Sequence, residues 1–274
     1  MDYYKKYRKY KGKYLNEKKK INVDSLMKDM KKNKSIYQQM LKRNNIDVDK
    51  LLEEKPNNFI NNLCKKIRQS NVKTYGSLDQ RRRIKNRIKD IKFLIGDKIR
   101  EDFKYIDIGC NDGSLTNGIA EYFNFKKGNV YGVDVEYWSG VKNDCGVDHM
   151  FYINEDNPIL PYKDNYFDLI TSFQVLHHNK NVKKMVKEIR RILKPGGYLV
   201  VREHDLRFNL TKELIDFEHI KYMCIEMDDW SFDNYIGDYK SLKEWNDLFN
   251  LKLVKYIKPN GLTRIYTNAY TKIN

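Results

Sequence analysis

The sequence predicts an α/β fold, an open sheet flanked by helices, behind a basic and mainly helical N-terminal extension. From Phe103 onward, short apolar runs of strand length alternate with segments whose apolar residues recur every three or four positions. Before Phe103 the apolar residues follow only the helical period. We therefore expect an extension at residues 1–75 that is helical or partly disordered, and an α/β domain at residues 76–274.

Charge is distributed unevenly between these two parts. The chain of 274 residues carries 53 Lys and Arg against 37 Asp and Glu, a formal net charge of +16. Residues 1–100 hold 30 of the basic and 11 of the acidic residues, so the remainder is close to neutral. A basic arm of this kind is typical of a protein that binds RNA or another polyanion, but a solvated lysine-rich face explains it equally well.

Composition argues against several protein classes. The sequence contains no run of about 18 apolar residues, so it predicts no membrane span. The basic N-terminus lacks the apolar segment of a secretory signal. Four cysteines are scattered without a Cys-x-x-Cys pair, so we expect neither a disulfide framework nor a cysteine zinc site, and a reducing, cytoplasmic location.

The first twenty residues form a Tyr/Lys-rich tract. Tyr3, Tyr7, Tyr10 and Tyr14 are spaced four, three and four apart, which on a helix makes one aromatic stripe between lysines. Gly12 weakens this helix, and a disordered basic tail is the alternative. The tract resembles the N-terminal segments of proteins from giant nucleocytoplasmic DNA viruses, which would imply a viral protein of the host cytoplasm or the virion.

Helices are expected through the rest of the extension and into the domain. Residues 24–70 have helical periodicity, interrupted at Pro56. Ser77 followed by Gln80 is a capping-box pattern that predicts the start of the next helix. Behind this cap Ile84, Ile88, Ile91 and Ile95 share one helical face, arginines and lysines occupy the others, and Gly96 can end the helix.

The remaining elements follow from the apolar pattern. Strands are expected at residues 105–108, 130–135, 167–173 and 198–201. Helices are expected at 114–123 and 182–193, the second ended by Pro195-Gly196-Gly197. Residues 251–257 and 264–270 predict a hairpin across Pro259-Asn260-Gly261.

The first strand leads into a turn, Asp107-Ile-Gly109-Cys110-Asn111-Asp112-Gly113. Its glycines stand four apart, which differs from the Gly-x-Gly-x-x-Gly spacing of dinucleotide sites. Carboxylates at Asp107 and Asp112 would repel a pyrophosphate, so we expect both to face a zwitterionic or cationic ligand. Taken alone, the segment is equally well interpreted as a plain glycine turn.

Further motifs follow in a fixed order. Asp134, at the end of the second strand, stands where a carboxylate accepts from ribose hydroxyls. Asp156-Asn157-Pro158-Ile159-Leu160-Pro161, Ser172-Phe173-Gln174 and Pro195-Gly196-Gly197 come next. In this order the series resembles the class I S-adenosylmethionine-dependent methyltransferases with a type 11-like domain, over roughly residues 86–205. The resemblance implies a Rossmann-like open sheet of about seven strands with a terminal antiparallel hairpin, and S-adenosyl-L-methionine as cofactor.

The resemblance also implies roles for individual residues. This sequence departs from the family pattern at Asn111-Asp112, where a second glycine is more usual. The implied cofactor contacts are these: Asp107, Gly109 and Gly113 shape the pocket; Cys110, Asn111 and Asp112 line the methionine part; Asp134 with Val135 binds the ribose; Asp156 and Asn157 face the adenine; Phe173 and Gln174 close the site beside the sulfonium.

Titratable residues cluster where the strands at 167–173 and 198–201 end. His177-His178 follows one strand and Glu203-His204-Asp205 the other, so we expect them on the rim above the cofactor, where they could position an acceptor or remove its proton. His178, Glu203 and His204 are our candidate catalytic residues, with a structural role as the alternative. Glu203, His204 and His219 lack regular ligand spacing, so no metal site is expected.

Three functions remain open from the sequence. The first is an RNA methyltransferase whose basic extension contacts phosphates. The second is a methyltransferase of a small molecule or protein, with a basic tail that serves localisation or packaging. The third is a non-catalytic subunit that keeps the fold and partners another protein. The acceptor atom and the oligomeric state cannot be predicted from these motifs.

Overall fold

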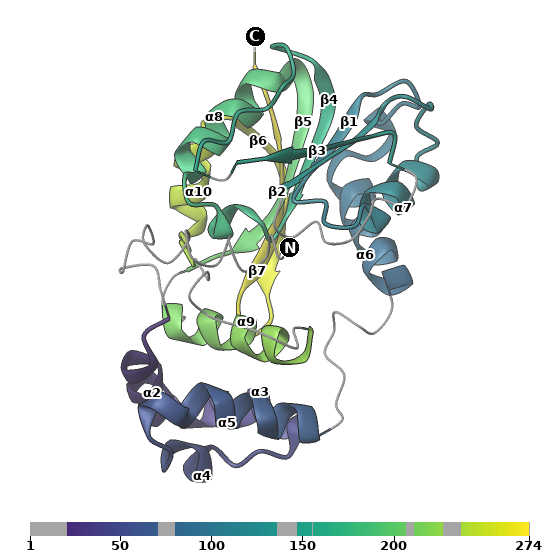
Figure 1. Cartoon of the computed structure of the whole chain (residues 1–274). Coiled ribbons are helices and arrows are strands. Elements are labelled where there is room, and N and C mark those ends of the chain that lie inside the picture. The colour runs from purple at the N-terminus through teal and green to yellow at the C-terminus, as the bar shows by residue number, and fades with distance from the viewer. Residues whose placement is uncertain are drawn as a thin grey trace, which may run out of the picture. The chain divides into compact units, whose positions relative to one another are not determined.

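The computed structural model describes residues 21–70, 80–135, 147–154, 156–206, 211–226 and 237–273 (Figure 1). The chain forms two compact units, one of Met1–Leu78 with Leu206–Tyr239, the other of Asp79–Asp205 with Lys240–Asn274. The predicted boundary at 75/76 lies close to Leu78, but Leu206–Tyr239, predicted in the α/β domain, belongs to the first unit. The Tyr/Lys tract and Ser77 fall outside the described residues. None of the helices in the described ranges is long and apolar enough to cross a membrane.

The first unit is helical. Asn22 caps its first helix by accepting from the Ser25 amide at 3.0 Å, and Asp47 caps another through the Asp49 amide at 2.8 Å. Pro56 occupies the first turn of a helix, where an N–H has no partner within the helix, so the missing N–H of proline costs no hydrogen bond. Pro56 therefore begins that helix. The helices are α2 (Val23–Lys32), α3 (Lys34–Leu41), α4 (Val48–Leu52), α5 (Pro56–Gln69) and α9 (Lys212–Glu226), with a short 3₁₀ turn at Lys42–Asn44.

Helix α9 completes the core of this unit. Phe59, Leu63 and Ile67 of α5 are buried in one apolar cluster with residues of α9. Tyr37 of α3 meets Phe217 of α9 edge to face, with ring centroids 5.0 Å apart. The extension therefore cannot bury its apolar face alone, which explains why a segment far along the sequence joins it.

A disulfide between Cys64 and Cys224 joins α5 to α9, with Cα atoms 4.9 Å apart. The expectation of no disulfide is therefore wrong. The two cysteines lie 160 residues apart and belong to no recognisable spacing, so only the folded unit shows that they meet. Cys110 is a free, buried thiol.

The second unit contains a seven-stranded sheet in the order β3-β2-β1-β4-β5-β7-β6, and Figure 1 labels each of these strands. The first five strands in this order pair in parallel, and β7 runs antiparallel to both β5 and β6. The predicted open sheet with its terminal hairpin is confirmed. The strands are β1 (Tyr105–Ile108), β2 (Val130–Val135), β3 (His149–Ile153), β4 (Phe167–Phe173), β5 (Leu193–His204), β6 (Lys252–Asn260) and β7 (Ile265–Thr271).

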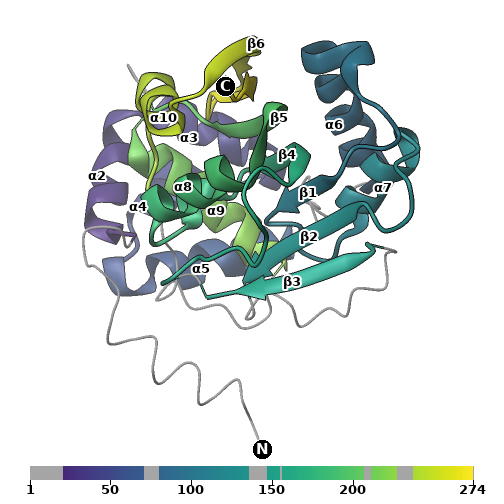
Figure 2. The ribbon, with the colours of Figure 1, turned by 90° about the horizontal axis from the view of Figure 1, so that it is seen from above.

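Helices cover both faces of the sheet (Figures 1 and 2). On one face α8 (Val182–Ile192) and α10 (Leu242–Phe249) bury Val186, Ile189 and Trp245. On the other, α6 (Gln80–Ile95) and α7 (Ser114–Tyr122) bury Ile91 and Ile119. The carboxyl ends of β1, β2, β4 and β5 therefore share one edge of the sheet, where ligands of open α/β folds bind.

The structure differs from the sequence prediction in several elements. Helices α9 and α10 and strand β3 were not predicted, and β3 exposes most of its side chains, so it lacks a strong apolar signal. Strand β5 was expected at 198–201 but extends to His204. Its last residues are polar, and they pair in register with Thr267, Tyr266 and Ile265 of β7. This extension decides where the side chains of Glu203 and His204 lie.

Candidate functional site

The turn after β1 is closed by a hydrogen bond from the Gly113 amide to the Cys110 carbonyl, 3.0 Å long. Gly109, Asn111 and Gly113 have positive φ angles of 79°, 52° and 79°. A Cβ on Gly109 would lie 2.2 Å from a methyl carbon of Val175, in the loop after β4. The positive φ and the overlap of any Cβ with Val175 both require glycine at position 109. Asparagine is tolerated at Asn111, because it can adopt the left-handed region.

Asp134 holds this turn against the end of β2. Its Oδ2 accepts from the Asn111 amide at 2.6 Å, and its Oδ1 accepts from the Val135 amide at 2.7 Å. Each oxygen has a second lone pair for a ligand hydroxyl. Burial raises the pKa of Asp134, and the two amide bonds oppose that shift. A carboxylate acceptor thus stands beside a backbone turn at the carboxyl edge of the sheet.

The two carboxylates of the turn serve the fold. Asp107 is 2% exposed, and its oxygens accept from Thr116 Oγ1 at 2.7 Å and Thr171 Oγ1 at 2.6 Å. Burial raises its pKa to about 6, against the opposing effect of the two hydroxyl bonds. Asp112 Oδ1 accepts from the Ser114 amide at 3.0 Å and so forms a local turn just before α7. The expectation that both carboxylates face the ligand is therefore wrong for Asp107, while Asp112 is committed to the local turn.

Other predicted cofactor residues are tied to their surroundings. The Cys110 thiol is buried 3.3 Å from Met150 Sδ, and that burial strongly raises its pKa, so only the Cys110 backbone can face a ligand. Asp156 forms an ion pair with Lys180 at 3.0 Å, and the Asn157 side chain accepts from Lys184. Adenine contact by Asp156 and Asn157 stays a prediction.

Phe173 ends β4, and Gln174 turns the chain away. Gln174 has a φ of 59°, and its amide donates to the Arg202 carbonyl at 2.7 Å. The next residue, Val175, packs on Gly109. The structure thus brings the predicted Phe173–Gln174 segment next to the turn after β1.

Glu203 anchors the loop that follows β4. Its Oε1 accepts from the amides of Val175 at 3.1 Å and Leu176 at 2.8 Å, and its Oε2 lies 2.5 Å from His177 Nδ1. Burial raises the pKa of Glu203 to about 7 and lowers the pKa of His177 well below its usual value. Both shifts favour the uncharged forms of the pair.

His204 and Asp205 also join separate segments. His204 Nδ1 lies 2.9 Å from the Thr263 carbonyl, and the Trp245 indole donates to the His204 carbonyl at 3.2 Å. Asp205 Oδ1 accepts from the Leu242 amide at 2.8 Å, at the start of α10. Glu203, His204 and Asp205 are all at most 1% exposed.

The expectation that Glu203 and His204 lie on an open rim is therefore corrected. They belong to β5 itself, because β5 extends to His204, so their side chains are enclosed by packing on the sheet. Among the three candidate catalytic residues only His178 is partly exposed. The structure leaves a direct role in proton transfer as a prediction for each of them.

Sequence reasoning missed Thr116 and Thr171, the partners of Asp107. Thr171 stands opposite Asp107 in the β1–β4 register, so correct strand pairing would have located it. Thr116 lies nine residues after Asp107 on the first turn of α7, and no motif marks it.

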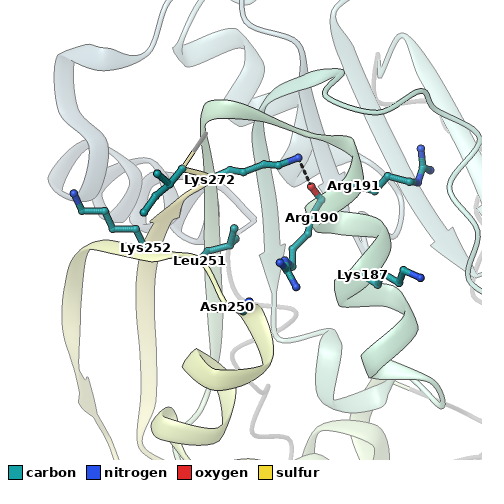
Figure 3. A pocket seen from close by; sticks show the side chains of 8 residues that line it. Lys187, Arg190, Arg191, Asn250, Leu251, Lys252 and Lys272 are labelled. Atoms are coloured by element: carbon teal, nitrogen blue, oxygen red, sulfur yellow. Dashed lines mark hydrogen bonds between the residues drawn. The ribbon is translucent and has the colours of Figure 1, made fainter.

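A separate basic cavity lies at the opposite ends of the parallel strands (Figure 3). It has a volume of about 750 Å³ where α8 ends and β5 begins. Lys272 Nζ donates there to the carbonyls of Arg190 at 2.9 Å and Leu193 at 3.0 Å, neutralising the C-terminus of α8. Its lining residues are Lys187, Arg190, Arg191, Asn250, Leu251, Lys252, Lys272 and Ile273. The cavity is not part of the turn-and-carboxylate site.

Comparison with known proteins agrees with the geometry at the carboxyl edge. A family model described as a methyltransferase domain matches residues 79–256, more than half of the chain. An uncharacterised methyltransferase of Bacillus subtilis strain 168, YcgJ, is 26% identical over 160 residues, which cover 54% of this chain and 62% of that protein. The ubiquinone/menaquinone biosynthesis C-methyltransferase UbiE of Wigglesworthia glossinidia brevipalpis is 30% identical over 152 residues, 52% of this chain and 59% of UbiE. The chain thus spans about three-fifths of the length of these two relatives.

A solved structure shares the fold. The [4+2]-cyclase SpnF superposes with a TM-score of 0.51 at 15% identity, over 70% of this chain and 81% of SpnF. This similarity shows that the two chains share a fold, and it shows nothing further. Because the family model matches more than half of the chain, the chain belongs to the methyltransferase-domain family.

Proposed function

We propose that this chain transfers a methyl group from S-adenosylmethionine to an acceptor. The observation that carries the proposal is Asp134, fixed by two backbone amides at the end of β2 with acceptor capacity left on each oxygen. Such a carboxylate suits ribose hydroxyls. The residues present therefore fit the cofactor of the family.

S-adenosylmethionine, when bound, supplies a methyl group already activated on a sulfonium. The protein must then align the acceptor and exclude water, and an acceptor that carries a proton also needs a base. We assign Asp134 to the ribose and the backbone of the Gly109–Gly113 turn to the methionine part. Glu203 positions the loop after β4 through Val175 and Leu176. His178, which is partly exposed, is our remaining candidate for a proton-accepting role.

Two acceptor classes have support. UbiE, by its name, methylates carbon in quinone biosynthesis, which favours a small-molecule acceptor. RNA is favoured by the exposed basic residues of α6, among them Arg81, Arg82 and Lys85, together with the basic first hundred residues. The likeness of residues 1–20 to giant-virus proteins supports a viral origin and a place in the host cytoplasm or virion.

Cofactor binding is the first test. Calorimetry on the full chain should show binding of S-adenosylmethionine, and Asp134→Ala should weaken it by about 10- to 100-fold, because charged hydrogen bonds contribute roughly 1.5–3 kcal/mol. Asp164→Ala is the matched control, since the Asp164 side chain is 70% exposed and pairs only with Arg191 among the described residues. A wild-type chain that does not bind the cofactor would overturn the proposal and favour the non-catalytic subunit.

The acceptor is then sought with a radiolabelled methyl donor over RNA, protein and metabolite fractions. Asp134→Ala is a better inactive control than a change at Asp107, because Asp107 holds Thr116 and Thr171 in the core. Full-length variants with Arg81, Arg82 and Lys85 changed to Gln test the RNA alternative. If RNA is the acceptor, these changes should weaken RNA binding and reduce its salt dependence.

A further inference from the structure

Three side chains lie in register across the sheet next to the proposed cofactor site. Phe173 of β4 pairs with Arg202 of β5, and Arg202 pairs with Thr267 of β7. Arg202 Nη1 donates to Thr267 Oγ1 at 3.3 Å. From α6, the guanidinium of Arg87 stands over the Phe173 ring, 5.8 Å from its centroid. Arg87 thus stands over the Phe173 ring, and Arg202 is the neighbour of Phe173 on the next strand.

This cluster contains more positive than negative charge. Arg87 pairs with Asp90 at 2.9 Å, whereas no carboxylate of the described residues lies within ion-pair distance of Arg202. Burial, with the neighbouring guanidiniums of Arg87 and Arg83, lowers the pKa of Arg202 to about 10, and the carboxylates of Asp90 and Glu203 oppose this shift. Arg202 is half-buried and forms no ion pair among the described residues, so the cluster has the charge to accept an anion.

The arginine cluster lies close to the turn proposed to bind the cofactor. Phe173 is the last residue of β4, and two residues later Val175 packs on Gly109 of the cofactor turn. Arginines beside a cationic sulfonium repel it unless a negative group is also present. Resting on the proposed function, we propose that Arg87 and Arg202 bind a carboxylate or phosphate group of a small acceptor molecule, with the Phe173 ring packing beside it.

Chemistry and burial both fit such an acceptor. A guanidinium offers paired donors that match the oxygens of a carboxylate or phosphate. Phe173 is 7% exposed and the Arg87 side chain 12% exposed, so the site admits the end of a small molecule more readily than a polynucleotide backbone. The methionyl carboxylate of S-adenosylmethionine would bind the same arginines in the same way. The experiment therefore distinguishes an anionic group of the acceptor from the carboxylate of the donor.

The test uses the full chain, saturated with S-adenosylhomocysteine, and follows its melting temperature as inorganic phosphate or benzoate is added. Wild type should be stabilised by one of these anions, and Arg202→Met should need at least about tenfold more anion for the same shift. Arg100→Met is the matched control, because the Arg100 side chain is 67% exposed and pairs with Asp102; it should respond like wild type. Without anion, Arg202→Met should melt no lower than wild type, since an apolar side chain there removes a half-buried charge that has no ion pair among the described residues.

Equal anion responses in wild type and Arg202→Met would overturn the proposal, as would the absence of any response in wild type. Arg87→Met provides the same test if Arg202→Met does not fold. Binding of S-adenosylhomocysteine is compared with that of 5′-methylthioadenosine, which lacks the methionyl carboxylate. If Arg202→Met weakens only the former by tenfold, the arginines hold the donor and the acceptor assignment is wrong. A wild type that binds neither nucleoside refutes the methyltransferase proposal, and the anion titration, then run on the chain without nucleoside, still tests the arginine site.

Discussion

Replacing Glu203 distinguishes a positioning residue from a proton-transfer residue. Glu203→Leu leaves the amides of Val175 and Leu176 and the ring nitrogen of His177 without their acceptor. At roughly 1–3 kcal/mol for each buried group left unsatisfied, three groups should lower the free energy of unfolding by about 5 kcal/mol. Glu203→Gln keeps a carbonyl oxygen for the two amides and can donate to His177 in its other tautomer, so it should cost only about 1 kcal/mol.

Guanidinium unfolding followed by circular dichroism measures these losses. Glu121→Leu is the control, because Glu121 is exposed and bonds only Asn117 among the described residues; it should change stability by less than about 0.5 kcal/mol. A Glu203→Leu chain as stable as Glu121→Leu would refute the reasoning. If Glu203→Gln folds and binds the cofactor normally but loses turnover, Glu203 moves a proton, as the sequence first suggested.

The pH dependence of stability gives a second measure of the same residue. Burial raises the pKa of folded Glu203 to about 7, so an unfolded chain loses its proton at lower pH than the folded one. Stability from this group is therefore full below the unfolded pKa and is lost as pH rises towards about 7. Glu203→Gln should flatten that part of the profile.

Three further predictions concern other parts of the chain. Gly109→Ala should abolish cofactor binding in a chain that still folds, because its Cβ would overlap Val175 at a positive φ; unchanged calorimetric affinity would contradict this. Changing Cys64 and Cys224 to Ser should lower the free energy of unfolding by up to about 5 kcal/mol, the loop-entropy value for a closure of this length, and reductant should then have no further effect on the melting temperature. Folded Asp107 has its pKa raised to about 6 by burial, so stability should fall as pH rises from about 4 to 6, and Asp107→Asn should remove that slope in denaturant titrations.

The sheet could be predicted because its apolar strands are continuous in sequence. The segments at 130–135 and 167–173 match β2 and β4 residue for residue. The edge strand β3 could not be recognised in this way, since its outward side chains give no apolar alternation. The end of β5 was missed because Arg202, Glu203 and His204 are polar, and only pairing with β7 keeps them in the strand.

The turn after β1 lies where the sequence predicts it, and its contacts with a cofactor stay a prediction, but the burial of Asp107 was not predicted. A sequence shows that Asp107 and Asp134 end neighbouring strands; it does not show which side chain points into the core. That depends on register, which places Thr171 opposite Asp107 and leaves Asp134 beside the Asn111 amide. The same limit applies to the arginine cluster, which is assembled from α6, β4, β5 and β7.

The first unit has a consequence for the order in which the chain is made. Its apolar core needs α9, yet most of the α/β domain is translated between α5 and α9. While a ribosome makes that domain, α2–α5 have emerged with the α9-facing surface uncovered, and the Cys64 thiol has no partner until Cys224 appears. Cutting the chain after residue 75 would therefore divide a core between two fragments, and neither fragment would contain a complete first unit.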